Sequence, residues 1–96
     1  MKSQFTNSAQ NEFDAAVIYI AARNPFAVRP FIDRVEKARR QIEEFPESGA
    51  PIPEFPQTEY RQVFARPYRI FYRVHEGTVI IAAFYHDRQI PQSLDK

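Results

Sequence analysis

The sequence predicts an α+β domain in which an N-terminal helical hairpin packs on a small antiparallel β-sheet. Apolar residues recur at three- and four-residue steps in the first half of the chain, which is typical of amphipathic helices. From Tyr60 to Arg88, β-branched and aromatic residues dominate and predict three short strands. The proline-rich stretch from Pro46 to Gln57 separates the two halves as a connector. We find no internal repeat, and residues 1–96 are expected to form one domain.

The first half begins with a short strand, expected at residues 2–5. Thr6 or Ser8 can then cap a helix that runs to about Arg23, because the residue before a proline avoids helical angles and Asn24-Pro25 follows. The spacing inside this helix is helical at four apolar positions: Phe13, Ala16, Val17 and Ile20.

A second, longer helix follows, with Asn24 as its expected cap and Pro25 at its first position. Its apolar stripe consists of Val28, Phe31, Val35, Ala38, Ile42 and Phe45. Pro30 conflicts with such a helix, since a proline inside it removes a hydrogen bond and costs about 3 kcal/mol. The sequence therefore predicts a kink near Arg29 or a helix that begins at Pro30.

In the second half, Glu76-Gly77 separates the strands expected at Tyr68–His75 and Thr78–His86, and glycine suits a two-residue hairpin turn. This turn pairs His75 with Thr78, and an unbroken ladder continues with Val74–Val79, Tyr72–Ile81, Ile70–Ala83 and Tyr68–Tyr85. One face of the hairpin would then be the core: Tyr68, Ile70, Tyr72, Val74, Val79, Ile81, Ala83 and Tyr85. The other would mix cations with bulky apolar groups: Arg69, Phe71, Arg73, Ile80, Ala82, Phe84 and His86.

A sheet face exposed to water is normally polar, so this mixed face should be covered by the C-terminal tail or by another chain. Arginine beside aromatic residues is the usual composition of a protein-binding hot spot. The alternative for Arg69 and Arg73 is a solvated or salt-bridged sheet surface, and the alternative for His86 is a structural role at a strand end. Arg61 can likewise serve to anchor the connector.

Composition excludes several kinds of chemistry. There is no cysteine, which rules out disulfides and thiol catalysis. Glycine occurs only at positions 49 and 77, so no phosphate-binding loop and no cofactor is expected. His75 and His86 lie on different strands, which makes a metal site improbable. The longest apolar run, residues 15–22, is too short to span a bilayer, and residues 1–13 lack the apolar centre of a secretion signal, so we expect a cytoplasmic location without membrane contact.

Several motifs together resemble the RelE/ParE superfamily of bacterial type II toxins over nearly the whole chain. The most specific is the run Tyr-Arg-Ile-Phe-Tyr-Arg-Val at residues 68–74. The others are Thr6, Ala9, Glu12 and Phe13 at the first helix, Asn24-Pro25, Phe45-Pro46-Glu47, Tyr60-Arg61, and His86 and Arg88 at the end of the last strand. The long hairpin and the final His-x-Arg are similar to the ParE-like branch.

The resemblance implies a toxin that inhibits DNA gyrase by binding, without catalytic residues, and that forms a hetero-oligomer with a ParD-like antitoxin. The mixed face predicts the target- or antitoxin-binding residues Arg69, Phe71, Arg73, Phe84 and His86, and the resemblance adds Arg88. The RelE-like alternative is a ribosome-dependent mRNA interferase, whose catalytic cluster would be Arg61, Arg69, Arg73 and His86. A net charge of +1 favours docking on ribosomal RNA only weakly. A protein with the toxin fold but without activity is a third possibility.

Overall fold

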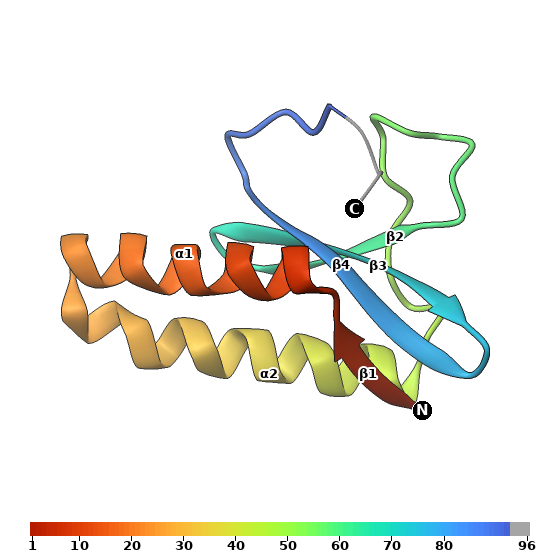
Figure 1. Ribbon diagram of the computed structural model, residues 1–96, viewed down its shortest axis with the longest axis horizontal. Coiled ribbons are helices and arrows are strands. Elements are labelled where there is room, and N and C mark those ends of the chain that lie inside the picture. Colours follow the sequence, from red (N-terminus) through yellow and green to blue (C-terminus); the bar gives the residue numbers. More distant parts are fainter. Residues whose placement is uncertain (93–96) are drawn as a thin grey trace.

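A computed structural model describes residues 1–92 of the chain. Its centre is a four-stranded sheet (Figure 1). A hairpin of two long helices covers one face of this sheet, and the proline-rich connector crosses the other. The α+β class and the helical hairpin are therefore confirmed, with the sheet enclosed between two covers.

The helical hairpin follows from its capping residues. Helix α1 spans Asn7–Arg23, and the Thr6 hydroxyl caps it by accepting the Ala9 N–H at 3.0 Å. Asn24 ends α1 in an extended conformation and caps the short 3-10 helix η1, Pro25–Ala27, by accepting the Phe26 N–H at 3.1 Å. Helix α2 then spans Val28–Glu44.

Pro30 fits α2 because η1 ends before it. Since α2 begins at Val28, Pro30 occupies the third helical position, where a backbone N–H would have no partner within the helix. The missing N–H of proline therefore costs no helical hydrogen bond there. The predicted start at Pro30 was wrong: the helix starts two residues earlier, directly after the tight turn of η1.

The sheet has the order β1-β4-β3-β2, with β1 at Lys2–Phe5, β2 at Arg61–Ala65, β3 at Tyr68–His75 and β4 at Thr78–His86. The ladders β2–β3 and β3–β4 are antiparallel, as predicted. Strand β1 pairs parallel with β4, which makes the sheet mixed and was not predicted. The first strand of the chain thus lies beside the last.

The β3–β4 turn lies at Glu76-Gly77, where the sequence predicted a two-residue turn. Glu76 and Gly77 have φ of 49° and 76°, both in the left-handed region that a type I′ turn requires. Around this turn His75 pairs with Thr78 and Val74 with Val79. The predicted register is therefore confirmed for the half of the hairpin nearest the turn.

A β-bulge changes the register in the other half. Tyr72 pairs with Ile81 but Phe71 pairs with Ala83, so Ala82 is an extra residue in β4. Beyond the bulge Ile70 pairs with Phe84 and Tyr68 with His86, in place of the predicted Ala83 and Tyr85. A shift of one residue reverses the faces. Phe84 and His86 consequently lie on the helix side, and Ala83 and Tyr85 lie on the far side.

Each sheet face carries its own apolar cluster. On the helix side, Phe31 and Ile42 of α2 pack with the fully buried Ile70, Tyr72 and Ile81. On the far side, Phe71 and Ala83 are buried beneath Ile52 of the connector, flanked by Phe55, Tyr60 and Tyr85. The connector of this same chain packs on the apolar part of the mixed face, a cover that the sequence did not predict. The tail was expected to cover this face, and its last four residues lie outside the described part of the chain.

The first residues of the connector are held by hydrogen bonds to a buried tyrosine hydroxyl, and a substitution can test how much these bonds stabilise the fold. The buried Tyr72 hydroxyl donates to the Pro46 carbonyl at 2.7 Å and accepts the Gly49 N–H at 2.9 Å. Tyr72→Phe should lower the free energy of unfolding by about 1–3 kcal/mol, because two backbone groups lose their partner. Urea denaturation would measure this. Tyr19→Phe, at a ring that is 42% exposed, is the control and should change stability by less than about 0.5 kcal/mol. Equal effects of the two changes would contradict the bridging role.

Candidate functional site

The bulge divides the predicted binding residues between the two faces of the sheet. Arg69, Phe71 and Arg73 lie on the far side, under or beside the connector. Phe84 and His86 lie on the helix side, where Phe84 packs in the main core and His86 contacts Tyr68 and Tyr19. The predicted single surface combining Arg69, Arg73, Phe71 and Phe84 is therefore not formed.

Arg69 is the most buried cation of the predicted set, with 8% of its surface exposed. Its Nη1 and Nη2 donate to the two carboxylate oxygens of Glu54 at 2.8 and 2.7 Å, and its Nε donates to Gln62 Oε1 at 2.8 Å. Gln62 in turn donates to the Pro51 carbonyl at 2.9 Å. This bidentate geometry is the strong form of the arginine–carboxylate pair. Arg69 thus fastens the connector to the sheet.

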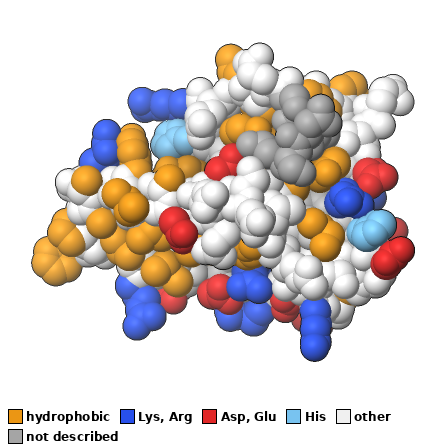
Figure 2. Space-filling view, viewed as in Figure 1, with side chains coloured by type: hydrophobic (Ala, Val, Ile, Leu, Met, Phe, Trp, Pro, Cys, Tyr) orange, Lys and Arg blue, Asp and Glu red, His pale blue; other side chains and the backbone are white. Residues whose placement is uncertain are grey.

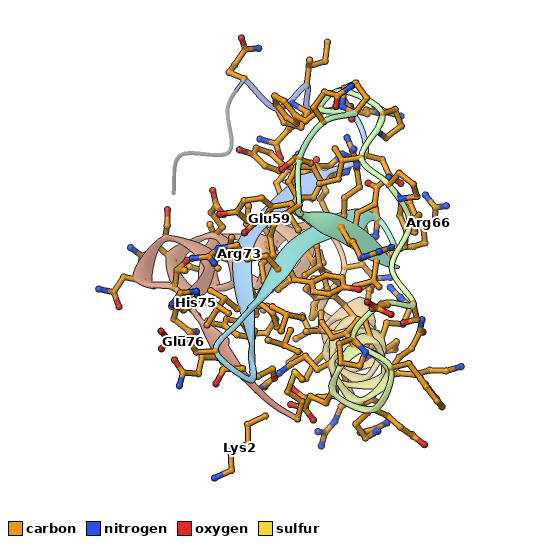
Figure 3. The ribbon with its side chains drawn as sticks, turned by 90° about the vertical axis from the view of Figure 1, so that its right-hand side faces the viewer. Lys2, Glu59, Arg66, Arg73, His75 and Glu76 are labelled. Atoms are coloured by element: carbon orange, nitrogen blue, oxygen red, sulfur yellow. The ribbon has the colours of Figure 1, made fainter. Side chains whose placement is uncertain are left out.

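Two further arginines hold the connector at its ends. Arg61 Nη1 donates to the Gly49 carbonyl at 3.1 Å, as the anchoring interpretation of the sequence predicted. Arg73 lies 3.6 Å from a carboxylate oxygen of Glu59, and the two are neighbours in Figure 3. The Arg73 side chain remains 29% exposed, so a partner could still reach it.

The ion pair with Arg69 changes the pKa of the Glu54 carboxyl group. The hydrogen bonds from Arg69 hold the pKa of Glu54 below its ordinary value, against the opposing effect of burial. Glu54 therefore stays ionised in the folded protein at pH values at which an ordinary glutamate already becomes protonated. This pair makes the attachment of the connector sensitive to acid.

The residues proposed for RNA cleavage are not brought together. Arg69 and Arg73 point to the far side, whereas His86 lies on the helix side beside Tyr68. Arg61 pairs with Tyr72 across the β2–β3 ladder, and its guanidinium donates a hydrogen bond to the Gly49 carbonyl. General acid–base cleavage needs such groups within hydrogen-bonding reach of one substrate. The arrangement instead gives the arginines structural contacts.

A groove of about 910 Å³ lies between α1 and the chain that leaves β4. His86 and Arg88 both line it, and the Arg88 N–H donates to His86 Nδ1 at 3.1 Å. The His86 ring centroid lies 6.1 Å from that of Tyr19 and 5.3 Å from that of Tyr68. The groove thus joins the two C-terminal candidates of the sequence analysis in one concave site.

Sequence reasoning missed the α1 side of this groove. Tyr19 and Arg23 line it, and the Arg23 guanidinium lies 3.6 Å from the centroid of the Tyr19 ring. Their spacing of four residues places them on one helix face, which was a usable signal. Nothing in the sequence indicated that this face of α1 meets the end of β4, so their connection to His86 could not be inferred.

The part of the chain that the structure describes contains neither a candidate metal site nor a candidate membrane-spanning helix. Over residues 1–92, no three histidine or acidic side chains are grouped as a metal site would need. Within the same residues, neither long helix has the length and apolar character to cross a bilayer.

Comparison with known families decides the class of protein. The family model for the ParE toxin of the type II toxin–antitoxin system parDE matches residues 4–91, which include both helices, all of β2 to β4 and the groove. The chain belongs to the ParE toxin family. It is thus a ParE toxin of a type II toxin–antitoxin system, as the resemblance implied.

A solved structure supports the ParE fold. A chain described as the chromosomal ParDE TA system from P. aeruginosa superposes with a TM-score of 0.72 at 17% sequence identity, covering 90% of this chain and 95% of that one. No curated protein matches the sequence. At this low identity the structural likeness concerns the ParE fold, and residue roles rest on the geometry described above.

The ion pair between Arg69 and Glu54, called the clamp below, should make the stability of this ParE-family chain depend on pH. Glu54→Gln should lower the free energy of unfolding near neutral pH by about 1–3 kcal/mol, since it leaves the buried Arg69 cation without a counter-charge. Because the folded pKa of Glu54 is depressed, this contribution is present above the ordinary value of 4.5 and fades as the pH falls through the folded pKa. Urea denaturation at neutral and acidic pH would measure it.

Glu59→Gln is the matched control for the clamp, because its pair with Arg73 is longer and its side chain is 69% exposed. It should change stability by less than about 1 kcal/mol. A Glu54→Gln effect that is the same at both pH values, or no larger than that of Glu59→Gln, would show that the Arg69–Glu54 pair does not hold the connector.

Proposed function

We propose that this protein inhibits DNA gyrase by binding and is neutralised by a ParD-like antitoxin in a hetero-oligomer. The observation that carries the proposal is the match of the ParE toxin family to residues 4–91. Gyrase acts on chromosomal DNA, so the proposed site of action is the cytoplasm.

The contacts of the arginines favour inhibition by binding over RNA cleavage. Arg61 and Arg69 are engaged by the connector, and His86 lies on the other side of the sheet from Arg69. Stabilising a phosphorane would need cations directed at one developing charge. These side chains are directed at carbonyl and carboxylate groups of the protein itself, which supports a toxin that occupies its target.

Recognition is assigned to the accessible members of the predicted set, which are Arg73, His86 and Arg88. Arg69, Phe71 and Phe84 are each less than 10% exposed and serve to shape the surface from within. Replacing Arg69 by glutamate would place two carboxylates face to face in a nearly buried site. Such a variant would test stability and would give no information on recognition.

Two assays on the purified chain test this function. It should inhibit supercoiling by gyrase with a dose dependence that saturates near one toxin per binding site, because the proposed action is occupancy rather than turnover. It should leave mRNA intact on translating ribosomes. Adding the antitoxin should restore supercoiling. Cleavage of mRNA at catalytic concentrations together with unaffected gyrase would replace this proposal by the mRNA interferase.

A further inference from the structure

The part of the connector that crosses the far side of the sheet, residues 51–59, is called the strap here. Figure 1 shows the connector as an irregular loop beside the sheet. Among the residues of the strap, all within the described chain, Ile52 alone is buried. The Phe55 N–H donates to the Ile52 carbonyl at 3.0 Å and the Thr58 N–H to the Phe55 carbonyl at 3.1 Å, so both bonds stay inside the strap. Segments with few buried apolar groups are those that open at low free energy.

Two contacts hold the middle of the strap on the sheet. The first is the clamp between Glu54 and Arg69, and the second is the packing of Ile52 on Phe71 and Ala83. They are adjacent, because the guanidinium carbon of Arg69 lies 5.0 Å from the centroid of the Phe71 ring. Breaking the clamp therefore loosens the cover of the apolar cluster beneath it.

The two ends of the strap are held with different strength. Ala50 and Gln62 exchange two backbone hydrogen bonds of 2.9 Å, and the Gln62 side chain donates to the Pro51 carbonyl at 2.9 Å. At the other end Glu59, whose side chain is 69% exposed, lies 3.6 Å from Arg73. Figure 2 shows acidic and basic side chains next to each other in solvent on the side where the β3–β4 hairpin lies. Solvated pairs contribute little to stability, so the firm attachment is the one at Ala50.

The apolar cluster under the strap is separate from the main core. The helix-side cluster includes Phe31, Ile42 and Ile81, whereas the far-side cluster has Phe71 and Ala83 beneath the strap. The β2–β3 and β3–β4 ladders form without any residue of the strap. Lifting the strap would therefore uncover the far-side cluster while the helices stay packed on the other face.

We propose that the strap opens as a local unit while the helices and the sheet stay folded, and that the clamp between Arg69 and Glu54 controls how often it opens. Opening uncovers Phe71 and releases the Arg69 guanidinium from its carboxylate. These two predicted binding residues are thus accessible only in the open state. The proposal concerns an equilibrium of the toxin alone, so it does not depend on the gyrase or antitoxin assignment.

Thiol labelling tests local opening, because the chain contains no cysteine of its own. Ala83→Cys places one thiol beneath the strap, and Ala65→Cys places one in the helix-side cluster at the same exposure of 1%. Each rate is divided by the rate of the same thiol in the unfolded chain. The thiol at position 83 should react at least about tenfold faster than the one at position 65, since local opening requires less free energy than global unfolding. Its rate should also rise less steeply with urea, because opening exposes less surface.

Glu54→Gln in the Ala83→Cys background tests the role of the clamp. At reagent concentrations where labelling is proportional to the opening equilibrium, the rate should rise about 10- to 100-fold, because the closed state then holds a buried cation without a counter-charge. Glu59→Gln in the same background is the matched control. It should raise the rate less than about fivefold, since its pair with Arg73 is solvated.

Equal normalised rates and equal urea dependence at positions 83 and 65 would overturn the proposal, because the strap would then open only with the whole fold. An effect of Glu54→Gln no larger than that of Glu59→Gln would overturn it too. Circular dichroism checks that each variant folds. Where a cysteine variant does not fold, hydrogen exchange of the chain without cysteine decides. The Phe55 and Thr58 amides should exchange faster than those of the β3–β4 ladder and be accelerated by Glu54→Gln, and failure of either would overturn the proposal.

Discussion

The bidentate pair between Arg69 and Glu54 makes a sheet with two apolar faces possible in a chain of this size. The helices cover one face, and the other has only a proline-rich segment without regular structure to cover it. Prolines limit the freedom of that segment, but they form few backbone hydrogen bonds. The pair therefore supplies a fixed point at the centre, and the Tyr72 hydroxyl and the Arg61 guanidinium fix the end near Gly49. Gly49 itself lies so close to the Tyr72 ring that a Cβ would be 2.5 Å from the hydroxyl oxygen.

Cations in this protein fall into two groups that composition cannot separate. The arginines of β2 and β3 face acids and carbonyl groups contributed by the connector, so they belong to the interior in spite of their charge. Arg23 and Arg88 line the groove and face solvent, and Arg23 is held by stacking on Tyr19. Within residues 1–92 neither of them forms an ion pair, so these two side chains differ from the arginines that hold the connector.

The features that could be predicted from the sequence are those set by residues close to them in the chain. Thr6, Asn24 and Glu76-Gly77 act within a few residues of themselves, and both ends of α1 and the two-residue turn were predicted from them. The bulge at Ala82 has no such signal, since an extra alanine looks like any other strand residue, and it alone moved Phe84 and His86 to the helix side. The connector was recognised as irregular, but its packing on Phe71 depends on contacts between distant segments. His86 was found from the strand pattern and Arg88 from the resemblance, whereas Tyr19 and Arg23 required the packing of α1.

The parallel pairing of β1 with β4 links the order of synthesis to the order of folding. Lys2–Phe5 leaves the ribosome first, yet its only ladder in the described chain is with Thr78–Ile81, which is made far later. Contacts of such long sequence separation form slowly, and domains tend to fold as units after their last element has emerged. The nascent toxin therefore carries an unpaired leading strand through most of its translation and completes its sheet only once the final hairpin has been synthesised.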